Sequence, residues 1–234
     1  MTPVVHHAIL RRAWGSSPRA RHFEFEMADG QQFDFRAGQF ISLHPNFNGE
    51  RTARAYSIAA RRGEHRFELC VSVQDLEGDA WFQSLRGGER VEFTGPFGSF
   101  KLRRPVTGVS AFIATGTGIA PVRAMIHELY RLHKPQEAWL IFGVRREVDI
   151  LYREEFENLA REHSSFRFIP TLSRPDARWD GHRGRVQIQI EKYLARKRPF
   201  NTYVCGSRAM VEEVRALLVT MGYPPGAVSF ERFE

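Results

Sequence analysis

The sequence contains only 2 cysteines, Cys70 and Cys205, and they lie far apart without the C-x-x-C spacing of metal and redox motifs. These thiols cannot complete a disulfide framework or the ligand set of an iron–sulfur cluster. No H-E-x-x-H motif or paired-carboxylate arrangement accompanies the 9 histidines. The sequence therefore predicts no metal site, no fused iron–sulfur domain and no hydrolytic zinc chemistry.

Long apolar runs are also missing from this chain of 234 residues. No stretch approaches the roughly 18 to 20 uncharged apolar residues that a membrane-spanning helix requires. No charged segment followed by an apolar segment opens the sequence, as it would in a secretory signal peptide. We therefore expect a cytoplasmic location and no membrane span.

Positive charge is in excess, with a formal net charge of +7, but arginine is scattered along the chain. No helix-turn-helix, zinc-finger or RNA-binding motif accompanies this charge, so nucleic-acid binding is not expected. A positive surface field instead favours encounter with an anionic partner.

The residues up to about Phe100 form short runs in which apolar and polar side chains alternate between turn signals. This period of two indicates strands, and several strands at close spacing favour an antiparallel barrel or sandwich. The expected strands are 22–26, 32–35, 39–43, 66–73 and 90–93. A short helix is expected at 79–85.

The pattern changes after a basic, proline-containing connection at residues 101–108. Apolar strands then alternate with helix-period segments, which is typical of a doubly wound parallel sheet covered on both faces. The expected strands are 109–114, 138–144, 166–172, 202–205 and 227–230, and the expected helices are 121–133, 153–162, 186–195 and 209–221. We therefore predict a barrel domain at 1–103 and an α/β domain at 104–234.

A glycine-rich turn, Gly116-Thr117-Gly118-Ile119-Ala120-Pro121, separates the first strand and first helix of the second half. Glycines in such a turn let the backbone approach a pyrophosphate, and the following helix presents unpaired N–H groups to it. Pro121 fits the first helical turn, where its missing N–H costs nothing. A structural turn is the alternative, but the strand before and the helix after favour nucleotide binding.

Two further segments complete a recognisable order: Arg54-Ala55-Tyr56-Ser57 before the glycine turn, and Val204-Cys205-Gly206-Ser207 after it. Together the three segments resemble the ferredoxin-NADP reductase superfamily, over nearly the whole chain. The resemblance implies an antiparallel flavin-binding β-barrel followed by an NAD(P)-binding α/β domain. FAD is the expected flavin, with FMN as the alternative.

The resemblance also implies roles for individual residues. Tyr56 would stack on the flavin ring, Ser57 would lie at the N5 edge, and Arg54 would bind the flavin phosphate; an ordinary exposed strand is the alternative. The segment Gly78-Asp79-Ala80 matches a phosphate-binding helix start, although Asp79 replaces the usual serine. A carboxylate facing a phosphate is unfavourable, so the Asp79 side chain is expected to turn away.

Near the C-terminus, the resemblance places Cys205 beside the nicotinamide and lets Gly206 admit the nucleotide to the backbone. Phe233 would cover the flavin, and Glu231 would serve as a proton or hydrogen-bond relay, unless this segment only packs on the barrel. The expected catalytic residues are Ser57, Cys205 and Glu231. The expected cofactor-binding residues are Arg54, Ala55, Tyr56, Ser57, Gly78, Asp79, Ala80, Phe233, Thr115, Gly116, Thr117, Gly118, Pro121, Arg145, Ser173, Arg174, Arg185, Cys205 and Gly206.

A 2′-phosphate is best held by arginine, whose planar fork forms paired hydrogen bonds. Arg145, Ser173-Arg174 and Arg185 resemble the 2′-phosphate contacts of bacterial members, so NADPH is favoured over NADH. Asp149 or Asp176 could repel the phosphate if either lies close to it.

The implied function is hydride transfer from NAD(P)H to FAD, with electrons passed to a small redox protein such as an acidic ferredoxin or flavodoxin. The alternatives are a flavin reductase, the reductase component of an oxygenase, and a non-catalytic electron-transfer subunit. The sequence does not determine the oligomeric state.

Overall fold

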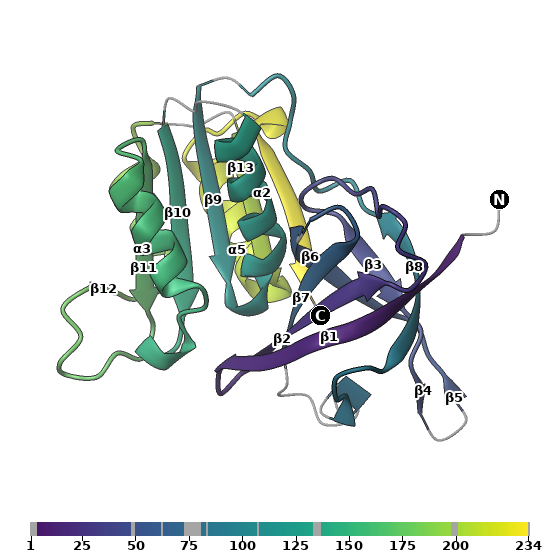
Figure 1. The fold of residues 1–234 in the computed structure, drawn as a ribbon. Helices are drawn as coiled ribbons and strands as arrows, with labels where there is room; N and C mark the ends of the chain where they lie inside the picture. The colour runs from purple at the N-terminus through teal and green to yellow at the C-terminus, as the bar shows by residue number, and fades with distance from the viewer. Residues whose placement is uncertain are drawn as a thin grey trace.

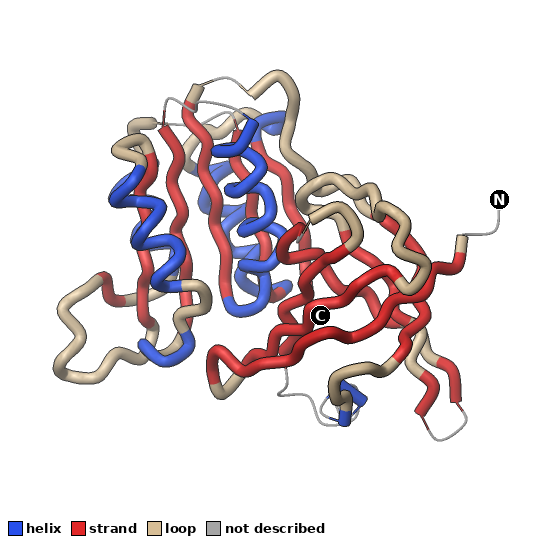
Figure 2. The backbone as a smooth tube through the Cα atoms, in the orientation of Figure 1, coloured by secondary structure: helices blue, strands red, loops and turns tan. Residues whose placement is uncertain are grey.

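The computed structural model describes residues 4–47, 50–61, 63–72, 81–82, 84–106, 108–132, 137–197 and 201–233. The chain forms a closed β-barrel and, beside it, a parallel sheet covered by helices (Figure 1). Figure 2 shows that the longer helices all belong to the parallel-sheet half. This is the predicted fold class.

Six antiparallel strands close the barrel. In order around the barrel they are β1 (Val5–Ser17), β2 (Ala20–Met27), β7 (Arg66–Ser72), β6 (Arg54–Arg61), β3 (Phe40–Leu43) and β8 (Arg90–Phe97). A small separate hairpin joins β4 (Asn46–Phe47) to β5 (Glu50–Arg51). Large side chains fill the barrel, including Phe23, Phe25, Phe67 and Phe93, which are all fully buried. Aromatic side chains on inward-facing positions of several strands therefore supply the barrel core.

The strand expected at 32–35 is wrong, because this segment has no regular secondary structure. Phe33 is buried, and its N–H donates to the carbonyl of Glu64 at 3.0 Å. The carbonyls of Phe33 and Phe35 accept hydrogen bonds from the guanidinium of Arg61 at 3.1 Å and 2.7 Å. An arginine side chain thus satisfies backbone groups that a neighbouring strand would otherwise pair with.

Residues 81, 82 and 84 have helical backbone, as expected for 79–85. Residues 79, 80 and 83 lie outside the described part of the chain.

The sheet of the second half has six strands, all parallel. In spatial order they are β12 (His182–Arg183), β11 (Phe166–Leu172), β10 (Glu137–Val144), β9 (Val109–Thr115), β13 (Asn201–Ser207) and β14 (Val228–Phe233). The helical segments are η1 (Gly116–Gly118), α2 (Ile119–Leu132), η2 (Glu147–Asp149), α3 (Arg153–Glu162), α4 (Val186–Leu194), α5 (Arg208–Thr220) and η3 (Pro225–Ala227).

The two faces of the sheet pack on different helices. Phe112 and Phe142 share a core with α2 and α3, whereas Ile113 and Ile141 share a core with α4 and α5. Burial on both faces explains why these strands are apolar without alternation.

Phe100 and Leu102, in the connection between β8 and β9, are buried in the same core as Phe112. The domain boundary after residue 103 stays a prediction. None of the described helices combines the length and apolar character needed to cross a membrane.

Two chain segments bring the halves together. The β1–β2 hairpin reaches from the barrel toward the carboxyl ends of the parallel strands, and β14 runs back to the barrel (Figure 1). The candidate site lies where these segments meet.

Candidate active site

A cavity of about 540 Å³ separates the tip of the β1–β2 hairpin from the carboxyl ends of the parallel strands. Ligands of open α/β sheets bind at this edge. Its walls come from both halves of the protein. The lining residues include Ser17, Arg19, Thr115, Gly116, Thr117, Arg145, Asp149, Ser173, Arg185, Ser207, Glu213 and Phe233.

The glycine turn forms η1, directly before α2, and its two glycines are needed for different structural reasons. Gly116 has φ of +54°, a conformation that favours glycine, and a Cβ added there would meet open space. It lines the cavity together with Thr117. A Cβ on Gly118 would lie 2.5 Å from the carbonyl oxygen of Cys205, so this glycine allows η1 to pack against β13. Pro121 lies in the first turn of α2, as predicted.

The predicted catalytic residues lie close together although they come from distant segments. The hydroxyl of Ser57, on β6, donates a hydrogen bond to Oε1 of Glu231 on β14 at 3.0 Å. Glu231 is the register partner of Cys205 on the adjacent strand β13. This contact joins the barrel strand to the last strand of the sheet.

Burial raises the pKa of Glu231 to about 7, and the hydrogen bond from Ser57 opposes part of that increase. Glu231 is therefore divided between its protonated and ionised forms near neutral pH. Burial also raises the pKa of Cys205 well above its ordinary value, and the charge of Glu231 adds to the increase. The Cys205 thiol is thus a neutral group rather than a nucleophile.

Cys205 is 0% exposed, and neither it nor Gly206 lines the cavity. Their neighbours Ser207 and Thr115 form the wall at this point. A contact between Cys205 and nicotinamide, which stays a prediction, requires movement of the residues that cover it. Phe233, which would cover the flavin, is half-buried and lines the cavity.

The expected flavin-binding residues of β6 have the chemistry that a flavin needs. Tyr56 is half-buried, and its ring meets Phe82 edge-on with centroids 4.9 Å apart. Arg54 is also half-buried. An aromatic ring, a hydroxyl and a cation on one strand fit a ring system that carries a phosphate. Ala55 lies exposed between them, and Gly78, Asp79 and Ala80 lie outside the described residues.

The residues expected at the 2′-phosphate divide into two groups. Arg145, Ser173 and Arg185 line the cavity, whereas Arg174 is exposed and does not. Arg185 forms an ion pair with Glu213 at 3.1 Å. Asp176 lies outside the cavity lining, where its side chain accepts the N–H groups of a turn.

Sequence reasoning missed Arg19 and Glu213 and named Asp149 only as a source of repulsion. Arg19 pairs with Asp149 in the cavity, with Nε and Oδ1 3.5 Å apart. No spacing in the sequence signals this pair, because the hairpin tip and η2, which follows β10, meet only in the folded protein.

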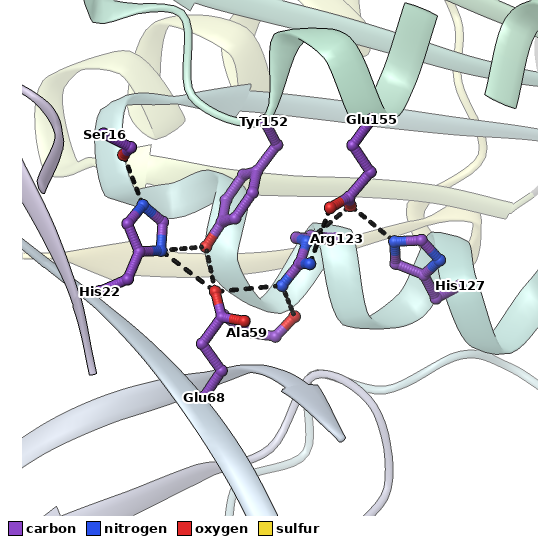
Figure 3. Close-up of polar contacts among 8 residues, drawn as sticks. All are labelled: Ser16, His22, Ala59, Glu68, Arg123, His127, Tyr152 and Glu155. Atoms are coloured by element: carbon purple, nitrogen blue, oxygen red, sulfur yellow. Dashed lines mark hydrogen bonds and ion pairs between the residues drawn. The ribbon is translucent and has the colours of Figure 1, made fainter. Parts of the chain in front are cut away.

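A buried polar cluster also joins the two halves beside the site (Figure 3). Glu68 of β7 is 0% exposed, and its Oε1 lies 3.2 Å from Nη1 of Arg123 on α2. The same oxygen lies 3.1 Å from Nδ1 of His22 and 3.2 Å from the hydroxyl of Tyr152. A buried carboxylate with three partners satisfies the rule that buried charges are paired.

Arg123 extends this cluster to β6 and to α3. Its guanidinium donates to the carbonyl of Ala59 on β6 at 3.4 Å and contacts both oxygens of Glu155 at 2.6 Å and 2.7 Å. Burial acts to raise the pKa of Glu155, but hydrogen bonds from His127 and Arg123 outweigh it and hold the pKa at about 2. The helix that follows the glycine turn is thereby tied to the strand of Ser57.

Two family models match the chain, one in each half. Residues 8–102 match an oxidoreductase FAD-binding domain, and residues 112–216 match an oxidoreductase NAD-binding domain. The barrel and the parallel sheet are therefore a flavin domain and a nicotinamide-nucleotide domain.

Similar proteins include reductases of two kinds. Ferredoxin–NADP reductase B of Sorangium cellulosum is 37% identical over 227 residues, which cover 93% of each chain. The reductase subunit of an aromatic O-demethylase from Amycolatopsis is 35% identical over 187 residues, 76% of this chain and 54% of that protein. The chain thus spans nearly all of the first relative but about half of the second.

Solved structures agree with these relatives. The Amycolatopsis cytochrome P450 reductase GcoB superposes on 100% of this chain and 71% of its own length, with a TM-score of 0.84 and 28% identity. A ferredoxin NADP+ reductase from Neisseria gonorrhoeae shares the fold, with a TM-score of 0.80, 22% identity, and coverage of 97% and 98%. The chain belongs to the ferredoxin-NADP reductase superfamily, and it is a flavin-dependent NAD(P)H oxidoreductase of the FAD-binding type.

Proposed function

We propose that this protein takes hydride from NADPH and delivers electrons to a small acidic redox protein, a ferredoxin or a flavodoxin. The hydrogen bond between Ser57 and Glu231 carries this proposal. This bond joins β6 to β14, and the glycine turn that lines the nearby cavity suits a pyrophosphate.

The residues of β6 would hold the flavin. Arg54 binds its phosphate, Tyr56 packs on its ring, and Ser57 fixes the edge at which hydride arrives. Bound FAD supplies the redox chemistry, accepting a hydride and releasing electrons singly, while the protein supplies orientation and electrostatics. Cys205 and Phe233 would shape the nicotinamide end of the cavity.

Glu231 would hold a proton near the flavin edge. Its pKa of about 7 makes both protonation states accessible at neutral pH, which suits a group that relays protons. Ser57 donates to the Glu231 carboxyl group and so orients it.

The nucleotide would lie along the carboxyl ends of the strands. Its pyrophosphate meets Gly116 and Thr117, and its adenosine end reaches Arg145 and Arg185, all of which line the cavity. These arginines support the preference for NADPH over NADH. Glu213 forms an ion pair with Arg185 and so competes with a 2′-phosphate for its guanidinium, which limits the preference for NADPH.

The test is stopped-flow reduction of the purified, flavin-loaded protein by NADPH. Ser57→Ala should slow flavin reduction about tenfold or more with little change in nucleotide affinity, because hydride transfer depends on the geometry at the reacting atoms. Ser110→Ala is the matched control, since Ser110 is a fully buried serine near the start of β9, at the opposite end of the strand from the cavity. Reduction rates that are equal in both variants would refute the role of Ser57.

The acceptor is tested separately. Turnover with an acidic ferredoxin or flavodoxin should exceed turnover with free flavin, and it should fall as salt screens the attraction to a protein of net charge +7. A protein that reduces free flavin faster than either redox protein, or that loses its flavin during gel filtration, would be a flavin reductase instead.

A reductase component of an oxygenase is the second candidate. The similarity to the Amycolatopsis O-demethylase reductase subunit and to the cytochrome P450 reductase supports it. Such a protein would transfer electrons to its oxygenase, or to cytochrome c as a surrogate, faster than to ferredoxin or flavodoxin. Steady-state assays with these acceptors distinguish the candidates.

A further inference from the structure

The barrel contributes one wall of the nucleotide cavity through the tip of its β1–β2 hairpin. Ser17, Arg19 and Ala20 line the cavity, and so does Ser72, the register partner of Ala20 on β7. Arg19 is the only charged residue among these four, and the other charged lining residues in the described part of the chain come from the α/β half. The hairpin thus carries a cation to a site formed mainly by the sheet.

Asp149, on the facing wall, holds Arg19 in place. Oδ1 of Asp149 lies 3.5 Å from Nε of Arg19, and its Oδ2 accepts the backbone N–H of Arg146 at 3.1 Å. Its side chain is 8% exposed, so it is a fixed carboxylate in the wall of the cavity. A dinucleotide carries several negative phosphate charges. The Asp149 carboxylate would repel these charges unless a cation neutralised the carboxylate.

We infer that Arg19 is a nucleotide-binding residue supplied by the flavin domain, oriented by Asp149 so that its guanidinium contacts a phosphate group of the bound dinucleotide. This inference rests on the proposed nucleotide site. Guanidinium has five N–H donors in a fixed fork, so an ion pair through Nε is compatible with a charge-assisted hydrogen bond to phosphate. Nucleotide binding would then bridge the two halves of the protein.

The experiment measures the dissociation constants of NADP+ and NAD+ from the flavin-loaded protein by calorimetric titration. Arg19→Gln should weaken binding about tenfold, the loss expected for one charge-assisted contact. Arg19→Lys keeps the charge and should retain most of the affinity. Arg12→Gln is the matched control, because Arg12 lies on the same hairpin, over the ring of Trp14, and outside the cavity lining.

The two nucleotides identify which phosphate is bound. Equal losses for NADP+ and NAD+ assign Arg19 to the pyrophosphate, whereas a loss confined to NADP+ assigns it to the 2′-phosphate. Three outcomes would overturn the inference. They are an unchanged affinity in Arg19→Gln, an equal loss of affinity in Arg12→Gln, and a loss in Arg19→Lys as large as that in Arg19→Gln. If the wild-type protein itself binds neither nucleotide, the proposed function fails, which is a different result.

Discussion

The hydroxyl of Tyr152 lies 3.2 Å from Oε1 of Glu68, and this contact crosses from the sheet half to the barrel half. Burial raises the pKa of Tyr152 well above its ordinary value, so the hydroxyl remains a proton donor. Tyr152 has φ of +55°, which is uncommon for a residue other than glycine. Its ring also packs against the guanidinium of Arg123 at 4.2 Å. A strained residue is thus retained where it contacts two buried charges of the interface.

Tyr152→Phe should destabilise the protein by about 1 to 3 kcal/mol, because it leaves the buried carboxylate of Glu68 with one donor fewer. Tyr130→Phe is the matched control, since among the described residues the Tyr130 hydroxyl has a hydrogen bond only with Ser165, at 3.3 Å, within the sheet half. Tyr130→Phe should lower the free energy of unfolding by about 0.5 to 1.5 kcal/mol. Denaturant unfolding measures both, and equal losses would show that the interface contact contributes nothing special.

The titration of Glu231 should be visible in both stability and turnover. Its pKa is about 7 in the folded protein, compared with about 4.3 for a glutamate in an unfolded chain. Between these values the unfolded chain loses a proton that the folded protein keeps. The contribution of Glu231 to stability is therefore fully present when the pH is below the pKa of the unfolded chain. It falls as the pH rises toward the pKa of the folded protein, and it stays low above that pKa.

Turnover that needs the protonated carboxyl should decline as pH rises through about 7, the pKa of Glu231. Glu231→Gln should flatten that part of the pH profile of kcat/KM, because glutamine cannot titrate. A profile in the variant that still declines with the same midpoint would assign the titration to another group.

The two glycines of the turn should respond differently to alanine. Gly118→Ala places a methyl group 2.5 Å from the carbonyl oxygen of Cys205, so we expect a stability loss of about 1 to 3 kcal/mol from overpacking. Gly116→Ala places its methyl group in the cavity, and it should weaken nucleotide binding about tenfold with a stability loss of about 1 kcal/mol.

Gly30→Ala controls for backbone strain in Gly116→Ala. Gly30 has φ of +69°, also has open space around its Cβ position, and does not line the cavity. Thermal melting and NADP+ titration of the three variants provide the measurements. If Gly116→Ala and Gly30→Ala bind the nucleotide with equal affinity, Gly116 is not part of the binding site.

Glu213→Gln should increase the preference for NADPH. The substitution removes the carboxylate that pairs with Arg185 at 3.1 Å and leaves the guanidinium available for a 2′-phosphate. We expect the ratio of kcat/KM for NADPH to that for NADH to rise about threefold to tenfold, as for one charge-assisted contact. Glu212→Gln is the control, because Glu212 is the next residue along α5, pairs with Arg208, and lies outside the cavity lining. A ratio that changes equally in both variants would point to a general charge effect.

Local patterns in the sequence predicted the longer strands and helices of the α/β half, but not the short strand β12. The limits of α3 (Arg153–Glu162) and β11 (Phe166–Leu172) agree with those expected from periodicity. The apolar residues of the helix recur on one face with helical spacing, and those of the strand form a short run. Both patterns depend only on the geometry of the element itself. The glycine turn was predictable for the same reason, since its strand, turn and helix are consecutive in the chain.

Contacts between distant segments were decided only by the tertiary structure. The bond between Ser57 and Glu231 joins residues 174 positions apart, and the resemblance named both residues without placing them in contact. The segment 32–35 has the alternation of a strand, yet Arg61 satisfies backbone carbonyls there in place of a neighbouring strand. Arg19 and Asp149 meet because the closed barrel directs its hairpin toward the sheet edge. Sequence periodicity records which face of an element is buried, but not which residues of another element face it, because that depends on how the two halves pack.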